Sequence, residues 1–247
     1  MPASPWYARP FREPKTSMLV LLGALCALVP AIVMWGFTVD DALIPLRYAH
    51  HIGAGVGYRF NPTGPITDGV TPLPWAPLMV PLSFNDDLVV VLERVKLLGV
   101  LIWTVGGALL GRALAAKVSA AEDEDRGRVF ALSVIALLTV ALAFPIGAYA
   151  ASGMETGVAT TLATLAAISF DRPRRAAVLA GLVATFRPEL LLWSIIVAAG
   201  AEIAAALSSA ASLPEEDAAR RPIVIGKRAA LAVGVAALPF ALCVVVR

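Results

Sequence analysis

The residues best suited to chemistry are two adjacent carboxylates, Asp40 and Asp41, near the start of a long polar interval at 38–87. Arg47 follows six residues after Asp41, and His50 lies within one helical turn of Arg47. A carboxylate can take a proton from an acceptor hydroxyl, and cationic side chains can hold a phosphate, which arginine binds through two parallel bonds. The pattern therefore predicts a site in which a hydroxyl is activated beside a bound phosphate.

Helix capping is an alternative explanation of the same acids. Residues 38–41 have the form of a capping box at the start of an expected interfacial helix, 39–52. In that arrangement Thr38 is the N-cap and Asp41 occupies the third helical position, where a carboxylate complements the helix dipole. Capping does not explain the second acid or the basic face that follows, and capping and catalysis can coexist.

The composition is typical of a polytopic membrane protein. Of the 247 residues, 59% are hydrophobic and only 15% are charged, whereas a soluble domain is about one quarter charged. Cys26 and Cys243 lie inside apolar runs, which indicates packing rather than a disulfide. His50 and His51 lack dedicated ligand spacing, so no metal site or cofactor is expected, although a divalent cation is left open. No nucleotide-binding fingerprint or basic-aromatic pattern is present, so no nucleic acid partner is expected.

The apolar runs predict an all-α fold, a transmembrane helical bundle of about seven spans forming one domain over 1–247. Residues 18–37 form an apolar run long enough to cross a bilayer. Five further runs are expected in the membrane: 88–113, 129–149, 157–170, 176–206 and 229–246. The run at 176–206 counts as two helices, because Arg187-Pro188-Glu189 interrupts it.

The intervals between these runs define the loops. Val70 to Phe84 is apolar but contains four prolines, Pro72, Pro74, Pro77 and Pro81, which makes a regular spanning helix there unfavourable. The interval 38–87 is therefore expected to be the first extracytoplasmic loop, carrying interfacial helices. Residues 1–17 are expected to form a cytoplasmic tail, and 207–228 a cytoplasmic loop.

The basic residues predict the orientation. With the N-terminus in the cytoplasm, all but six of the 20 Lys and Arg residues fall on the inner segments. The six on the outer side are Arg47, Arg59, Arg94, Lys96, Arg187 and Arg247. The positive-inside rule thus favours this orientation. It places Asp40 and Asp41 on the outer face of the cell (inner) membrane.

Two later motifs fall on that same outer face. Gly153-Met154-Glu155-Thr156 lies at a helix junction, with Glu155 expected in the first turn of the next helix, where it could act as a cap. Arg187-Pro188-Glu189 breaks an apolar run, and an internal salt bridge around a kink would explain it. Ionisable residues at a broken membrane helix are often functional, so we retain Glu155, Arg187 and Glu189 as candidate site residues.

These motifs together resemble a known family. Asp40-Asp41-Ala42, Arg47-Tyr48-Ala49, Phe60-Asn61-Pro62 and Gly69-Val70-Thr71 before Trp75 resemble the first external loop of bacterial GT-C glycosyltransferases. The branch they resemble most contains the mycobacterial-type terminal arabinofuranosyltransferases and related mannosyltransferase-like proteins. The two later motifs are similar to motifs of that branch and follow in the same order.

The resemblance implies a polyprenyl-phosphate-linked sugar as donor and a glycan or lipid of the cell envelope as acceptor, among membrane lipids. Asp40 and Asp41 would then be catalytic. The residues expected to bind substrate are Arg47, Tyr48, His50, Asn61, Thr71, Trp75, Glu155, Arg187 and Glu189.

Two departures from the family qualify this expectation. Pro45 falls inside the expected helix and could kink it beside Asp41. Family members usually continue with further spans, whereas this sequence stops at Arg247, so three alternatives stay open: a fragment that lacks its C-terminal half, a split enzyme with a second membrane subunit, or a degenerate homologue. A non-catalytic subunit is therefore an alternative function. A small transporter with its site at 187–189 is another, although it lacks the paired inverted repeat of such proteins.

Overall fold

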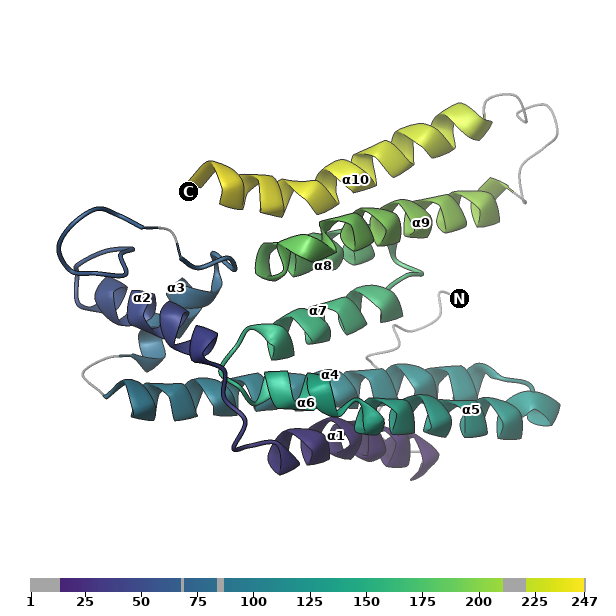
Figure 1. Ribbon diagram of the computed structural model, residues 1–247. Helices are drawn as coiled ribbons and strands as arrows, with labels where there is room; N and C mark the ends of the chain where they lie inside the picture. Colours follow the sequence, from purple (N-terminus) through teal and green to yellow (C-terminus); the bar gives the residue numbers. More distant parts are fainter. Residues whose placement is uncertain (1–13, 68, 84–86, 211–220, 247) are drawn as a thin grey trace. The chain divides into compact units, whose positions relative to one another are not determined.

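The computed structural model describes residues 14–67, 69–83, 87–210 and 221–246, and Figure 1 shows their helices. All secondary structure in these ranges is helical, which confirms the all-α fold. Of the expected cytoplasmic tail at 1–17, residues 1–13 lie outside the described ranges. The elements are α1 (Pro14–Val33), η2 (Asp40–Ala42), α2 (Leu43–Gly53), α3 (Trp75–Met79), η3 (Val80–Leu82), α4 (Leu88–Ala120), α5 (Asp123–Leu142), α6 (Phe144–Ala150), α7 (Thr156–Ile168), α8 (Pro173–Phe186), η4 (Pro188–Leu190), α9 (Leu191–Ala210) and α10 (Arg221–Val246), where η marks a 3₁₀ turn.

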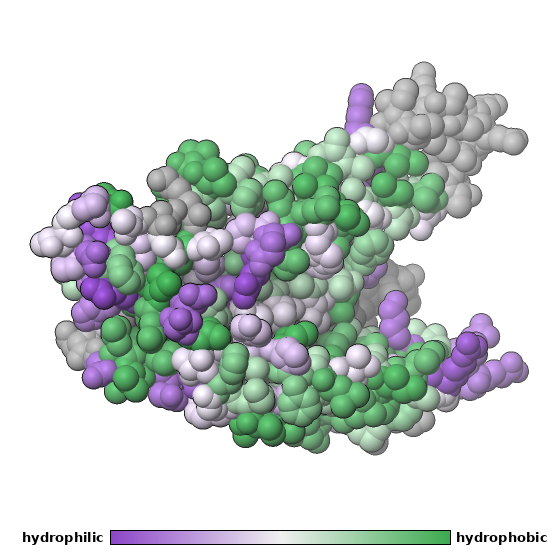
Figure 2. Space-filling view, in the orientation of Figure 1, coloured by the Kyte–Doolittle hydropathy of each residue, from purple (hydrophilic) through white to green (hydrophobic). Residues whose placement is uncertain are grey.

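Three described helical stretches are long and apolar enough to cross a membrane: Thr16–Val33, Pro188–Ser209 and Ile225–Val246. Counting α5 with α6 as one bent span raises the number to four. The expected run at 157–170 corresponds to α7, whose 13 residues reach only about 20 Å, less than the hydrocarbon core of about 30 Å. Figure 2 shows apolar side chains widely exposed on the surface, as the lipid-facing parts of a membrane protein would be.

Two stretches differ in detail from the runs in the sequence. The run at 129–149 is not one straight helix, because α5 and α6 meet at a bend of 60°. Pro145 lies in the first turn of α6 and has no backbone N–H to continue α5, which explains the break. Helix α9 runs to Ala210 and α10 begins at Arg221, so both helices extend into the interval 207–228 that was expected to be a loop. Residues 211–220 between them lie outside the described ranges.

The chain divides into two compact units. Unit 1 contains the residues up to Val39 and Lys96–Gly157, and in it α1 packs against α5 and α6. Helix α1 also meets α4 at very short range: a Cβ added to Gly107 would lie 2.3 Å from the carbonyl oxygen of Gly23. Only glycine permits such an approach of two backbones.

Unit 2 contains Asp40–Val95 and the residues from Val158 onward. Helices α8, α9 and α10 pack together through small side chains, with Ala177, Ala198 and Ala236 buried between them. The expected break of the 176–206 run is confirmed, because α8 ends at Phe186 and α9 starts after the 3₁₀ turn η4. In the same unit α2 packs against α3.

Candidate functional site

The acidic pair forms a short turn of its own. Asp40 and Asp41 lie in η2, and both side chains are exposed. The backbone N–H of Asp41 donates to Oδ1 of Asp40 at 3.1 Å, so one acid partly caps the turn that it begins. Because both side chains are exposed, both carboxylates are accessible to a molecule from outside the fold.

The expected capping box is wrong. Helix α2 begins at Leu43 with Ala42 at its N-cap, and no side chain caps it. The hydroxyl oxygen of Thr38 instead accepts a hydrogen bond from Nζ of Lys96. The expected helix 39–52 is thus divided into η2 and α2, and Pro45 lies in the first turn of α2. A proline is tolerated there because the backbone N–H groups of a first turn have no partner within the helix.

Tyr48 fixes the loop that follows α2. Its side chain is fully buried, its hydroxyl donates to the carbonyl oxygen of Thr67, and the same oxygen accepts from the backbone N–H of Gly69 at 3.0 Å. The ring packs beside Tyr58, with the ring centroids 4.7 Å apart. Tyr48 was expected to bind substrate, but its hydroxyl is used to hold the loop backbone.

Arg47 performs a similar task one residue earlier. Its Nε donates to the carbonyl oxygen of Phe60 at 2.8 Å, and its Nη2 donates to Oδ1 of Asn61 at 3.4 Å. The guanidinium also lies 4.5 Å from the centre of the Phe60 ring, a cation–π contact. The structure therefore brings together Arg47 and Asn61, two expected site residues, and fixes the orientation of the guanidinium.

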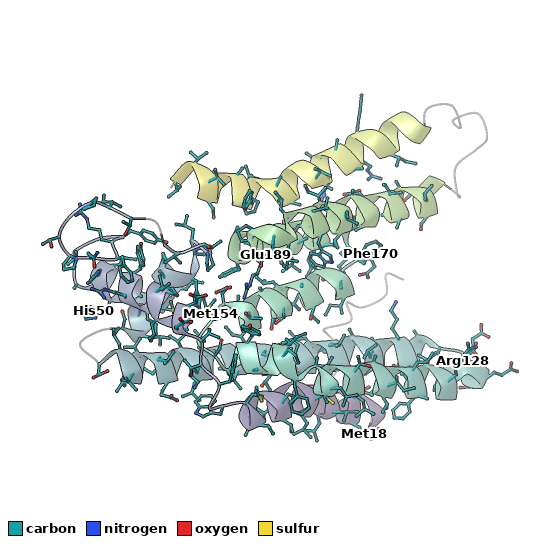
Figure 3. All side chains as sticks on the ribbon, viewed as in Figure 1. Met18, His50, Arg128, Met154, Phe170 and Glu189 are labelled. Atoms are coloured by element: carbon teal, nitrogen blue, oxygen red, sulfur yellow. The ribbon has the colours of Figure 1, made fainter. Side chains whose placement is uncertain are left out.

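His50 and His51 follow Arg47 and Tyr48 on the same helix, α2. Nδ1 of His51 hydrogen-bonds to the carbonyl oxygen of Arg59 at 2.8 Å. His50, labelled in Figure 3, is half-buried, and its Nδ1 is buried without a hydrogen-bond partner in the described part of the chain. In the same described residues no group of three or more His, Cys, Asp or Glu side chains is placed to hold a metal ion.

Trp75 connects the loop to the helical part of unit 2. It is 1% exposed, and its ring meets that of Phe186 edge-on with the centroids 6.5 Å apart. Phe186 ends α8 and directly precedes Arg187. The contact thus brings the segment with Trp75 and the exposed Thr71 next to the segment with Arg187. Trp75 is a core residue at this position.

Arg187 and Glu189 form the expected ion pair at the break between α8 and α9. Nη1 of Arg187 lies 3.4 Å from Oε1 of Glu189, and the two side chains are 28% and 59% exposed. An exposed pair of this kind contributes less than about 1 kcal/mol to stability, so stability alone is a weak reason for it. Glu189 is labelled in Figure 3.

Glu155 belongs to unit 1, whereas the other candidate residues belong to unit 2. It was expected in the first turn of α7, but it directly precedes that helix, which begins at Thr156. Its side chain is 1% exposed. The preceding turn uses Gly153 at a φ of 91°, a conformation that favours glycine.

Lys96 is a residue that the sequence analysis missed. It was counted only as an outer basic residue, yet it is 3% exposed. Its Nζ donates to the carbonyl oxygen of Trp35 at 2.6 Å and to Oγ1 of Thr38 at 3.2 Å, and lies 4.9 Å from the centre of the Trp35 ring. The available signal was the position of this lysine inside the apolar run 88–113. A charged side chain in a membrane is costly unless it is paired or functional.

No protein-family model, curated protein or solved structure matches this chain. The functional argument therefore depends on the residues and their geometry. In chemical terms, unit 2 presents the exposed carboxylates of Asp40 and Asp41, the guanidinium of Arg47 held by Phe60 and Asn61, and the guanidinium of Arg187 at a helix break. Such a set can accept a proton and bind an anionic group.

Proposed function

We propose that this protein is a GT-C-type membrane glycosyltransferase that moves a sugar from a polyprenyl-phosphate donor to a cell-envelope acceptor on the extracytoplasmic face. The observation that supports this most is the exposure of Asp40 and Asp41 in η2, directly before α2, whose Arg47, Tyr48 and His51 fix the loop that follows the helix. Catalysis requires accessible acids on a rigid support, because a reacting group must be held in place.

In the proposed reaction, one of the two aspartates accepts the proton of the acceptor hydroxyl. The hydroxyl oxygen attacks the anomeric carbon of the sugar, the bond between that carbon and the phosphate oxygen breaks, and polyprenyl phosphate leaves. This direct displacement inverts the anomeric configuration. A general base typically contributes about 10²–10⁴-fold to the rate, and holding both reactants in place supplies up to about 7–11 kcal/mol.

We assign the donor phosphate to two arginines of unit 2, Arg47 and Arg187. Arg47 is half-buried and held by Phe60 and Asn61, so its guanidinium needs little further ordering when an anion binds. Arg187 is paired with Glu189 but remains partly exposed.

In the proposed topology the N-terminus is cytoplasmic, and about seven helices cross the cell membrane.

The first experiment measures transfer of a radiolabelled sugar from a polyprenyl-phosphate donor in membrane vesicles. We expect Asp40→Asn or Asp41→Asn to lower transfer by about 10²-fold or more, with little change in folded yield. Asp125→Asn is the matched control, because Asp125 is also an exposed aspartate but lies on α5, in unit 1. If both loop variants transfer sugar at the wild-type rate, the catalytic assignment is wrong.

A second candidate function is a non-catalytic membrane subunit. It is favoured by one observation: Tyr48 and Trp75, both in the motifs of the resemblance, are buried and make internal contacts. Motifs kept only for their structural role would look the same. This alternative predicts that both aspartate variants are tolerated and that the chain co-purifies with a second membrane protein.

A further inference from the structure

Lys96 is the residue at which the chain returns to unit 1. The chain leaves unit 1 after Val39 and re-enters it at Lys96. The hydrogen bond from Nζ of Lys96 to Oγ1 of Thr38 therefore joins the two ends of the 40–95 segment, although the two residues are 58 positions apart. Both partners belong to unit 1. We call the contact of Lys96 with Trp35 and Thr38 the Lys96 junction.

The environment of Lys96 explains why a buried ammonium is tolerated there. Trp35 lies just beyond the end of α1, and its carbonyl oxygen points out of a turn held by hydrogen bonds from Met34 N–H to Pro30 and from Phe37 N–H to Met34. The C-terminal end of a helix carries partial negative charge, which favours a cation. The face of the Trp35 indole adds a cation–π attraction.

The Lys96 junction also lies next to the acids along the chain. Thr38 precedes Asp40 by two residues, and the capping role expected for its hydroxyl is replaced by the bond to Lys96. The backbone entering η2 is thereby held at one end by α1 and by α4. Without that bond, the residues before Asp40 would lose a long-range constraint that their own sequence does not replace.

We propose that Lys96 is a positioning residue for the acidic pair: the Lys96 junction fixes the backbone from which Asp40 and Asp41 project. The inference rests on the proposed glycosyltransferase function for its catalytic consequence. Its structural consequence, an ordered entry to η2, holds whatever reaction the acids perform.

The structural consequence is tested by a spin label at Asp41→Cys in a full-length chain in which Cys26→Ala and Cys243→Ser remove the native thiols. We expect Lys96→Met to shift the electron paramagnetic resonance spectrum towards faster label motion. Thr38→Val, which removes only the hydroxyl acceptor, should give a smaller shift in the same direction. Lys117→Met is the matched control, because Lys117 is an exposed lysine on the same helix, and it should leave the spectrum unchanged.

The effects of Lys96→Met and Thr38→Val on label motion should not add. Since both remove one shared interaction, the double variant is expected to match Lys96→Met alone. Label motion that is unchanged in both single variants, or effects that add in the double variant, would overturn the proposal. If Lys96→Met does not fold, the label motion in Thr38→Val alone tests the proposal. This substitution removes one hydroxyl from an exposed residue and leaves Lys96 in place.

The catalytic consequence is measured separately, with the native acids present. We expect Lys96→Met to lower kcat by about 10²-fold, the loss typical of a reacting group displaced by about 1 Å, with the KM for the donor nearly unchanged. Wild-type transfer that survives intact in Lys96→Met contradicts this inference and leaves the glycosyltransferase function standing. Absence of transfer in the wild type, combined with the expected change in label motion, refutes the function and leaves the positioning role standing.

Discussion

At the scale of single residues, the loop after α2 is held by side chains that reach back to its backbone. Tyr48, Arg47 and His51 bond to carbonyl oxygens at Thr67, Phe60 and Arg59 respectively. A loop without regular secondary structure has few backbone partners of its own, so each such bond restricts it considerably. The order of this loop therefore depends on a few hydroxyl, guanidinium and imidazole groups.

Tyr48→Phe tests this dependence. The substitution keeps the buried ring but removes the oxygen that bonds to Thr67 and Gly69. We expect a loss of about 1 kcal/mol in local stability, seen as faster amide hydrogen exchange in the peptide around Gly69. Tyr149→Phe, on an exposed ring of α6, should leave that exchange unchanged. Equal exchange in the wild type and Tyr48→Phe would show that the hydroxyl does not order the loop.

At the scale of elements, the helices of unit 1 approach one another through glycines. Gly107 and Gly111 of α4 both face α1, and a Cβ at Gly111 would lie 2.1 Å from the carbonyl oxygen of Leu19. Apolar side chains gain little by leaving lipid for protein, so packing of small residues is a main source of helix association in membranes. The α1–α4 pair should therefore be sensitive to a single added methyl group.

Gly107→Ala is the corresponding test. The new methyl group would lie 2.3 Å from the Gly23 oxygen and 2.7 Å from Cβ of Ala27, so the helices must move apart. We expect a destabilisation of about 1–3 kcal/mol, measured by unfolding in mixed detergent micelles. Gly234→Ala in α10 is the control, because nothing lies within 4 Å of its added Cβ. A Gly107→Ala protein as stable as Gly234→Ala would contradict this packing.

Local sequence patterns predicted the elements well where a local cause decides them. Runs of apolar residues indicated α1, α9 and α10, and the charged break at 187–189 indicated the end of α8. The failures have causes elsewhere in the chain. The hydroxyl of Thr38, expected in a capping box, bonds instead to a lysine 58 residues away, and the buried Trp75 packs against Phe186 from a distant segment. Such contacts between distant segments leave no periodic signal in one sequence.

At the scale of the whole molecule, the apolar helices determine how the chain can cross a membrane. Three or four described stretches qualify as spans by length and composition, whereas the runs in the sequence predict about seven. Helix α4 has 33 residues, about 50 Å at 1.5 Å per residue, which exceeds the hydrocarbon core. Its last turns contain Arg112 and Lys117, which lie on the cytoplasmic side in the orientation that we propose.

The proposed orientation can be tested with single cysteines in the chain without native thiols. Ile66→Cys probes the loop after α2, where Ile66 is 67% exposed, and Asp125→Cys probes the exposed start of α5. We expect a membrane-impermeant thiol reagent to modify Ile66→Cys in intact cells. It should modify Asp125→Cys only after permeabilisation, because the basic residues flanking Asp125 favour the cytoplasm. The reverse pattern would place Asp40 and Asp41 on the cytoplasmic face, out of reach of a donor and acceptor on the outer leaflet.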